Sequence, residues 1–383
     1  MILLRIALAF LALMLLPDWY IYKVYVSSWR KKYRKLHWLP AVALLLILLV
    51  FILAHDQLSD YFGVYLVVAL CIAVPKAVFA LSSLFFRGIG RLFKVSLPHG
   101  KLSWVPALLV LGYILYGATR GKEDFQIKEV TFVSPDLPEA FSGYRIVQLS
   151  DIHAGSWKGN GEALARAIAL CNTCNADLAV FTGDLVNSHA DEMKAYMPVF
   201  SQLKAKDGVY SVLGNHDYAA YRHWDSEAAR QANIDTLITR QNGMGWHVLM
   251  NENRIIRRGG DSIALVGVEN SGNPPFPNYG DLPKALKGTE GMFKVLLSHD
   301  PTHWRRNVLP ETDIQLMLAG HTHDMQISVL GFSASRYIYP EHRGMYLEGN
   351  RGLYVNVGLG FVLFPMRLGA WPEITVITLR KNK

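Results

Sequence analysis

Long apolar runs fill the first third of the chain and almost disappear after it. Residues 1–118 hold nearly all of them, whereas apolar and polar positions alternate from about Thr119 onward, as in an ordinary globular domain. A helix needs about 20 apolar residues to cross the hydrocarbon core of a bilayer. The pattern therefore predicts a membrane region at 1–118 and a second domain at 119–383. The runs predict four transmembrane helices, at Ile2–Tyr22, Trp38–Ala54, Tyr61–Phe86 and Trp104–Tyr116.

The four runs differ in how clearly they predict a span. Leu39–Ala54 contains no charge, whereas Trp104–Tyr116 is short enough to be a re-entrant or surface helix instead. Arg5 precedes an apolar stretch as in a signal peptide, but no small-residue cleavage site follows, so we interpret the first run as a retained helix. Lys76, beside Pro75, is a charge within the third run and so a functional candidate. A lysine that snorkels or faces the helix bundle is the slightly favoured interpretation.

The charge is as unevenly distributed as the hydropathy. Residues 1–118 carry 12 Lys and Arg against 3 Asp and Glu, whereas the rest carries 27 against 28. The overall charge of +8 is therefore a property of the membrane region. Binding to a phosphate backbone needs a basic excess. The second domain lacks that excess, so we expect no nucleic-acid partner.

Basic residues also predict which way the chain faces, because cytoplasmic loops are enriched in Lys and Arg. The loops after the first and third runs are rich in them, and the loop after the second has none, so we expect a multi-pass protein of the cell membrane with the second domain outside the cytoplasm. A short linker, about Gly117–Glu129, would then hold that domain near the outer leaflet. If the fourth run does not cross, the domain faces the cytoplasm instead. The basic residues are Lys23, Arg30, Lys31, Lys32, Arg34 and Lys35 in the first loop, and Arg87, Arg91, Lys94 and Lys101 in the third.

The second domain has the pattern of a layered α/β fold. Short apolar runs alternate with helical stretches such as Gly161–Cys174 and Asp191–Leu203. Fully apolar runs such as Leu178–Phe181 are typical of strands covered on both faces. Cys171 and Cys174 form a CxxC, which we interpret as ordinary helix residues because no second pair is present to complete a metal site. The predicted strands are Tyr144–Ser150, Asp177–Thr182, Val209–Leu213, Ile263–Val268, Lys294–Ser298, Ile314–Ala319, Leu353–Val357 and Glu373–Leu379.

Five of these strands end in side chains that bind metal. In α/β sheets the carboxyl ends of strands gather at one edge, where ligands bind. A glycine precedes Asp184, Asn215 and His321, which suits sharp turns close to a ligand. The sequence therefore predicts that one set of side chains meets at this edge. These are Asp151, His153, Asp184, Asn215, His299, His321 and His323.

The composition of this set indicates the chemistry. Imidazole and carboxylate together suit divalent metals such as Zn, Mn and Fe. Seven ligands are too many for one four-coordinate ion but suit two, if a carboxylate is shared. Two ions roughly 3.5–4 Å apart can clamp an in-line phosphoryl displacement, and a bound ion lowers the pKa of water toward neutrality. Each motif alone is weak, but five in order, each directly after an apolar run, favour a metal site.

The ordered set resembles the motifs of the calcineurin-like metallophosphoesterases. The likeness covers about Gly143–Leu379, and the preceding helices are similar to those of bacterial membrane-tethered members. The resemblance implies a β-sandwich flanked by helices and a hydrolase for a phosphate ester, and the sequence does not separate a monoester from a diester or a pyrophosphate. The predicted position near the outer leaflet makes a lipid-borne phosphate ester the preferred substrate. The motifs are Asp151-Ile152-His153, Gly183-Asp184-Leu185-Val186-Asn187, Gly214-Asn215-His216-Asp217, His299 and Gly320-His321-Thr322-His323.

The resemblance also implies a role for each matching position. Asp184 would bridge two metals. His216 would contact the phosphate and assist the leaving oxygen, Asp217 would orient His216, and Asn187 would be structural. Asp151, His153 and His323 would complete one metal site, and Asn215, His299 and His321 the other.

One departure from the family pattern follows the last ligand. Tethered relatives often continue Gly-Gly-Gln after the second histidine, whereas this chain continues Asp324-Met325-Gln326. Arg305 and Arg306 could contact a phosphate, but a solvated helix face is the favoured interpretation.

Two other classes of function compete with a hydrolase. A catalytically silent metal-binding scaffold should have lost a ligand, and none is lost. A transporter with an accessory domain would need more than one intramembrane charge. Activity of the isolated domain would discriminate between these classes.

Overall fold

The computed structural model describes residues 2–382, with side chains for all of these except 2–9, 55–57, 59 and 60. The chain divides into two compact units, which are described separately. The helical unit comprises Met1–Arg120 and Leu363–Met366, and the α/β unit comprises Gly121–Val362 and Arg367–Lys383.

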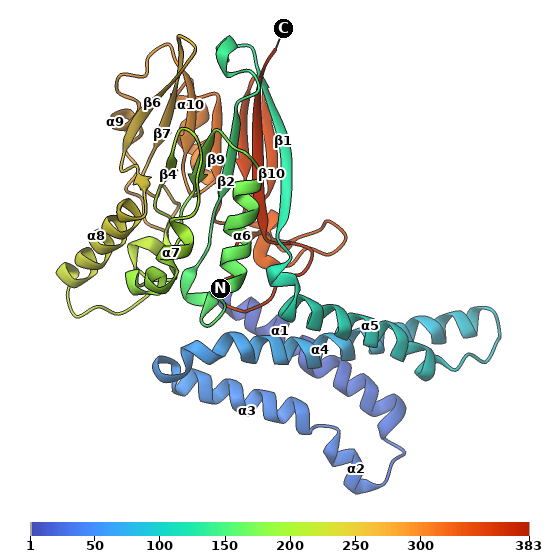
Figure 1. The fold of residues 1–383 in the computed structure, drawn as a ribbon. Helices are drawn as coiled ribbons and strands as arrows, with labels where there is room; N and C mark the ends of the chain where they lie inside the picture. The colour runs from blue at the N-terminus through green and yellow to red at the C-terminus, as the bar shows by residue number, and fades with distance from the viewer. Residues whose placement is uncertain (1, 383) are drawn as a thin grey trace. The chain divides into compact units, whose positions relative to one another are not determined.

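The helical unit is built from apolar helices that pack as neighbours in sequence. Its helices are α1 (Ile2–Ile21), α2 (Lys31–Leu36), α3 (Leu39–Leu53), α4 (His55–Leu92) and α5 (His99–Thr119), with a π-helical turn, η1, at Tyr22–Val26 (Figure 1). α4 packs along α5, and α1 packs against α4. Their shared core includes Met14, Leu44, Phe51 and Tyr65, and the Tyr65 hydroxyl donates to the Leu44 carbonyl at 3.1 Å.

The membrane helices are longer than the sequence predicts at two places. Among the described residues, three helical segments are long and apolar enough to span a membrane, namely Lys31–Leu53, Tyr61–Leu92 and His99–Glu123. The predicted fourth run is therefore the core of a full-length helix, because α5 begins at His99 and contains 21 residues. The first run forms α1, whose first eight side chains are outside the described set, so its span remains a prediction.

Lys76 faces the helix bundle, which is one of the two alternatives in the favoured interpretation. Its ammonium lies 2.8 Å from Oδ1 of Asp18, a carboxylate that is 1% exposed. His37 also contacts this region, with its Nε2 2.9 Å from the Asp18 carbonyl oxygen. The helical unit thus neutralises its one described buried acid with its own lysine.

The α/β unit contains two six-stranded sheets, as the layered prediction requires. The first sheet has the order β1-β12-β2-β3-β4-β5 and the second β10-β11-β9-β8-β7-β6. Strands β2 to β5 are mutually parallel, as are β7, β8, β9 and β11, and β12 runs antiparallel to β2. The strands are β1 (Gln126–Ser134), β2 (Arg145–Leu149), β3 (Leu178–Phe181), β4 (Val209–Ser211), β5 (Trp246–Val248), β6 (Glu252–Arg258), β7 (Asp261–Gly267), β8 (Phe293–Leu297), β9 (Leu316–Ala319), β10 (Gly344–Glu348), β11 (Arg351–Val355) and β12 (Glu373–Lys381) (Figure 1).

Three hydrophobic clusters hold these layers together. The middle one joins the facing sides of the two sheets, with Ile146 and Val180 of the first against Leu265 and Val295 of the second. The outer face of the first sheet is covered by α6 (Gly161–Thr173) and α8 (Glu227–Gly243). The outer face of the second carries a π-helical segment, Trp304–Val308, and the short helix α9 (Leu282–Leu286). The unit is therefore a β-sandwich flanked by helices.

The sequence missed or misjudged some elements. β1, β5, β6, β10 and α8 were not predicted, and the helix predicted at Asp191–Leu203 is a 3-10 segment, Ala190–Tyr196, followed by one short helix, Met197–Phe200. Cys171, within α6, and Cys174, directly after it, are free, buried thiols. Their packing agrees with an ordinary structural role.

Candidate metal centre

All seven predicted ligands lie at strand ends that meet at one edge of the sandwich. Asp151 and His153 follow β2, Asp184 follows β3 and Asn215 follows β4, so these come from the first sheet. His299 follows β8, and His321 and His323 follow β9, so these come from the second. Asp151, His153, Asp184, Asn215, His299 and His323 are 5% exposed or less. The two sheets therefore contribute to one buried site.

Asp151, His153 and His323 form the first cluster that could hold an ion. One ligand atom from each lies within 4.8 Å of the other two. His153 Nε2 is 3.0 Å from His323 Nε2, which is itself 3.2 Å from Asp151 Oδ1. Burial acts to raise the pKa of the Asp151 carboxyl, but the His323 and His299 charges hold it well below its usual value. Asp151 is therefore an ionised carboxylate facing two imidazoles.

Asp184, His299 and His321 form the second cluster, under the same 4.8 Å limit. His299 Nε2 lies 3.2 Å from Asp184 Oδ2 and 3.3 Å from His321 Nδ1. The amide oxygen of Asn215 is 3.1 Å from the same His299 nitrogen. The second cluster therefore has four candidate ligands.

Asp184 connects the two clusters. Its Oδ2 is 3.2 Å from His299 Nε2 in the second cluster and 3.7 Å from His153 Nε2 in the first. Its Oδ1 accepts the backbone N–H of His216 at 2.8 Å. One carboxylate is thus placed to be shared by two ions.

The donor set fits divalent cations, because electron pairs face one another across each cluster. The Nδ1 of His299 lies 2.7 Å from the Thr182 carbonyl, which can only accept, so Nδ1 carries a proton and Nε2 is the nitrogen that faces Asp184 and Asn215. Burial alone would lower the pKa of His299, but attraction to the Asp184 and Asp151 carboxylates raises it to about 10. Without metal, the site draws a proton into the place where a cation would be held.

The backbone at the site is strained in a way that aims the ligands. Five of the seven predicted ligands have left-handed backbone, which costs a residue with a Cβ roughly 1–2 kcal/mol. A Cβ on Gly214 would lie 2.2 Å from Oδ1 of Asp184, so the predicted need for glycine at this turn has a steric cause. The five are Asp151 (φ 52°), His153 (50°), Asp184 (60°), His321 (75°) and His323 (50°). Such clustered strain is typical of functional sites.

His216 is oriented by Asn187 and not by Asp217, which corrects the prediction. His216 Nδ1 lies 2.8 Å from the Asn187 carbonyl oxygen, so Nδ1 donates there and Nε2 is left to face the site. The His216 ring meets the His153 ring edge-on, with centroids 4.8 Å apart. Asn187 also places its Oδ1 3.0 Å from His153 Nδ1. Its structural role therefore extends to positioning two site histidines.

Asp217 instead holds the backbone that carries Asp184. Its carboxylate accepts the N–H groups of Asp184, Leu185, Val186 and Gly214 at 2.8–3.2 Å. A side chain bonded to four amides has no capacity left to reach the His216 ring. Burial and the Asp184 charge raise the pKa of Asp217 to about 7, which the Gly214 and Val186 amides oppose.

Sequence reasoning missed four side chains around the centre. Arg367 is fully buried, with Nη2 3.2 Å from His323 Nδ1 and 2.8 Å from the Val357 carbonyl. The Tyr221 hydroxyl accepts from Asn215 Nδ2 at 2.8 Å, and the Tyr339 hydroxyl lies 2.9 Å from His321 Nε2. Asp300 lies one residue after a predicted ligand, with Oδ2 3.8 Å from His321 Nε2. Only Asp300 had a sequence signal, its place at the end of β8.

The Arg305 side chain is 52% exposed, as the interpretation of a solvated face expects, whereas Arg306 is half-buried. Arg305 forms ion pairs with Glu341 and Glu348 at 2.5 and 2.7 Å. Arg306 donates to the Ser271 carbonyl at 2.8 Å. Both guanidinium groups are therefore committed to neighbouring loops.

The departure after His323 has a structural consequence. Asp324 and Met325 adopt left-handed backbone (φ 46° and 50°), at positions where the related pattern has glycine. Asp324 is fully buried and pairs with Arg343, Oδ2 to Nη1 at 3.0 Å. This ion pair fixes the loop that glycine would have left free.

Two family models match the chain. The one described as "Calcineurin-like phosphoesterase" covers residues 144–325, and the one described as "Probable Calcineurin-like phosphoesterase, transmembrane domain" covers residues 4–122. The first includes all seven predicted ligands. The second coincides with the helical unit.

The chain is also similar to known proteins and to solved structures. The chain is 32% identical over 278 residues to the uncharacterized metallophosphoesterase YkuE of Bacillus subtilis, covering 70% of this chain and 90% of that one. It is 29% identical over 330 residues to a "Transmembrane protein with metallophosphoesterase domain" of Danio rerio, covering 83% and 72%. Among solved structures, the NAD nucleotidase of Haemophilus influenzae superposes with a TM-score of 0.37 at 16% identity, over 57% of this chain and 45% of that one.

Proposed function

Because this chain belongs to the calcineurin-like metallophosphoesterases, we propose that it is a membrane-anchored two-metal enzyme that hydrolyses a phosphate ester. The observation that carries the proposal is the shared position of Asp184, whose Oδ2 lies 3.2 Å from His299 and 3.7 Å from His153. The membrane region would be residues 1–118 and the catalytic domain 119–383.

The ligand assignment follows from the two clusters. Asp151, His153, Asp184 and His323 would hold one ion, and Asp184, Asn215, His299 and His321 the other, with Mn, Zn or Fe as the candidates. Bound divalent ions would neutralise the phosphate oxygens and lower the pKa of water. The protein's own contribution is to hold these ligands rigidly, through Asp217 under the Asp184 turn and Asn187 beside His153.

His216 is the group that would move a proton. Its Nδ1–H is committed to the Asn187 carbonyl, so the orientation of the ring is fixed and only Nε2 can face substrate. A protonated Nε2 would bind a phosphoryl oxygen and donate its proton to the leaving oxygen, as general acids do. His216 as a whole is half-buried.

The substrate is proposed to be lipid-borne. The transmembrane domain and the alternation of basic loops support a multi-pass protein with its catalytic domain at the outer face of the membrane. An enzyme held there meets esters of lipids or lipid-linked groups. The alternative, a silent metal-binding scaffold, is disfavoured because no predicted ligand is missing from the sequence.

The test is hydrolysis by the full-length protein in detergent with defined metals. We expect cleavage of an aryl phosphate monoester or diester, and His216→Ala should lose most of the rate while retaining its metal. Loss of metal from His216→Ala would contradict its role as a proton donor. Hydrolysis of neither ester, with metal bound, would favour the scaffold.

A further inference from the structure

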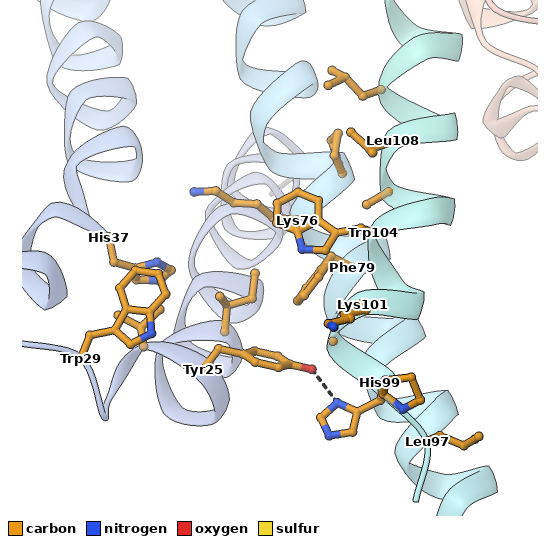
Figure 2. A pocket seen from close by; sticks show the side chains of 17 residues that line it. Tyr25, Trp29, His37, Lys76, Phe79, Leu97, His99, Lys101, Trp104 and Leu108 are labelled. Carbon is orange, nitrogen blue, oxygen red and sulfur yellow. Dashed lines mark hydrogen bonds between the residues drawn. The ribbon is translucent and has the colours of Figure 1, made fainter.

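The helical unit contains a pocket of about 700 Å³ that the phosphoesterase chemistry does not use. Its walls come from η1, α4 and α5 and from the segment Leu97–Lys101, and they are overwhelmingly apolar. This volume is within the range of sites that enclose small organic molecules. Phe79, Trp104 and Leu108 form the apolar part in Figure 2.

One end of the pocket is polar and built by packing. The Tyr25 hydroxyl lies 2.7 Å from His99 Nδ1 and 2.5 Å from the hydroxyl of the fully buried Ser83. Gly100 permits this arrangement, because a Cβ there would lie 2.8 Å from the Tyr25 ring. Figure 2 shows the Tyr25 and His99 side chains meeting at the end of the pocket away from Leu108.

The charges of the lining favour an anion. Lys76 and Lys101 both line the pocket. Lys76 is neutralised by Asp18 at 2.8 Å, but no carboxylate among the described side chains pairs with the exposed Lys101. Trp29, half exposed, also lines this region, as aromatic side chains do at membrane interfaces. An occupant should therefore combine an apolar tail with a negative head.

We propose that this pocket binds an acidic phospholipid, with an acyl chain along Trp104 and Leu108 and the headgroup phosphate near His99 and Lys101. Basic pockets between transmembrane helices on the cytoplasmic side are suited to such headgroups. The pocket is lined from both Lys- and Arg-rich loops, those after α1 and after α4. A zwitterionic lipid brings a choline cation together with its phosphate, so only an acidic lipid adds net negative charge beside Lys101. The proposal does not depend on the substrate of the catalytic domain.

The test is native mass spectrometry of the full-length protein in detergent, titrated with dioleoyl phosphatidylglycerol or dioleoyl phosphatidylcholine. We expect phosphatidylglycerol to be retained several-fold more strongly. Lys101→Gln should weaken it about fivefold, because a basic side chain near a lipid surface contributes about 1 kcal/mol. The matched control is Lys94→Gln, which does not line the pocket and should change binding less than twofold.

A second pair of variants tests the acyl end. Leu108→Trp fills the pocket and should weaken retention of phosphatidylglycerol several-fold, whereas Leu109→Trp, its neighbour outside the lining, should not. Equal retention of the two lipids would overturn the proposal. Equal effects of Lys101→Gln and Lys94→Gln would also overturn it, because they would indicate a diffuse basic surface. Unchanged retention of phosphatidylglycerol by Leu108→Trp would overturn it as well.

Discussion

The two units of this protein treat buried charge in opposite ways. In the helical unit, the buried Asp18 carboxylate faces the Lys76 ammonium at 2.8 Å, and the pair is neutral. In the α/β unit, the buried carboxylates of Asp151 and Asp184 face imidazole nitrogens instead. A self-neutralised pair needs no ligand, whereas carboxylates and lone pairs facing one another need a cation. The difference separates a structural buried charge from a functional one.

The backbone shows the same contrast. Five of the seven predicted ligands have left-handed backbone, whereas Asp18 and Lys76 do not. Strain persists where the surrounding structure over-determines it. The α/β unit thus places its strain and its charge at the same strand ends.

The largest expected effect comes from removing the shared carboxylate. Asp184→Ala takes a ligand from both clusters, so metal binding and hydrolysis should both fall, the rate by about a thousandfold or more, since two-metal stabilisation amounts to several kcal/mol. The rate is measured with an aryl phosphate, against Glu139→Ala, an exposed carboxylate, as control. If Asp184→Ala is fully active, the buried Asp184 carboxylate has no functional role that distinguishes it from the structural carboxylate of Asp18.

Breaking the pair in the helical unit should affect stability and leave metal content unchanged. Lys76→Met leaves the buried Asp18 carboxylate unpaired, which typically costs about 3–5 kcal/mol. Replacing both partners, as Asp18→Leu with Lys76→Met, should recover most of this loss. Unfolding in detergent measures both variants. If the single substitution lowers the unfolding free energy less than the double substitution does, Asp18 and Lys76 do not compensate each other's charge.

A buried histidine outside the clusters provides a pH test. Burial, followed by repulsion from Arg306, lowers the pKa of His303 from 6.5 to about 4. Below pH 6.5 the unfolded chain binds a proton that the folded protein does not. The neutral, buried His303 therefore makes its full contribution to stability above pH 6.5. This contribution, about 3 kcal/mol, is lost as the pH falls through 4.

The comparison uses His303→Gln with the metal-free protein. Its unfolding free energy should depend less on pH between 6.5 and 4 than that of the unsubstituted protein. His247→Gln, at an exposed position, should retain the original dependence. An identical pH dependence in all three proteins would show that His303 is not buried neutral.

The smallest effect concerns strain beside the site. Met325 has φ 50° and a half-exposed side chain, so Met325→Gly should relieve the left-handed penalty with little loss of packing. The expected gain is about 0.5–1 kcal/mol, after allowing for the greater entropy of unfolded glycine. Gly331→Ala, at φ 82°, should have the opposite sign in the same thermal unfolding assay. If Met325→Gly instead destabilises the protein, the packing of the Met325 side chain stabilises the fold by more than the left-handed backbone destabilises it.

The sequence could predict which side chains meet at the site, because each directly follows an apolar strand. Strand ends of a covered sheet must meet at an edge, so the pattern alone could place Asp151 beside His323, although the two are far apart in the chain. Elements with weak alternation, such as β6 and β10, carried no comparable signal. α8 was missed because it is largely polar, with only a few buried positions such as Ile234 and Leu237.

Side-chain partnerships were the part that sequence could not provide. Asp217 was expected to orient His216, but its carboxylate accepts from neighbouring backbone amides. Arg367 and the Asp18–Lys76 pair depend on packing between segments distant in sequence. Such contacts are set by tertiary geometry, which no local pattern encodes.

The central claim is that the α/β unit holds two divalent ions through one shared carboxylate. Elemental analysis of the purified full-length protein, reconstituted with Mn, Zn or Fe, measures this directly. We expect close to two ions per chain in the unsubstituted protein and in His216→Ala, and a large loss in Asp184→Ala. A stoichiometry of one or none in the unsubstituted protein, or two ions retained by Asp184→Ala, would contradict the account.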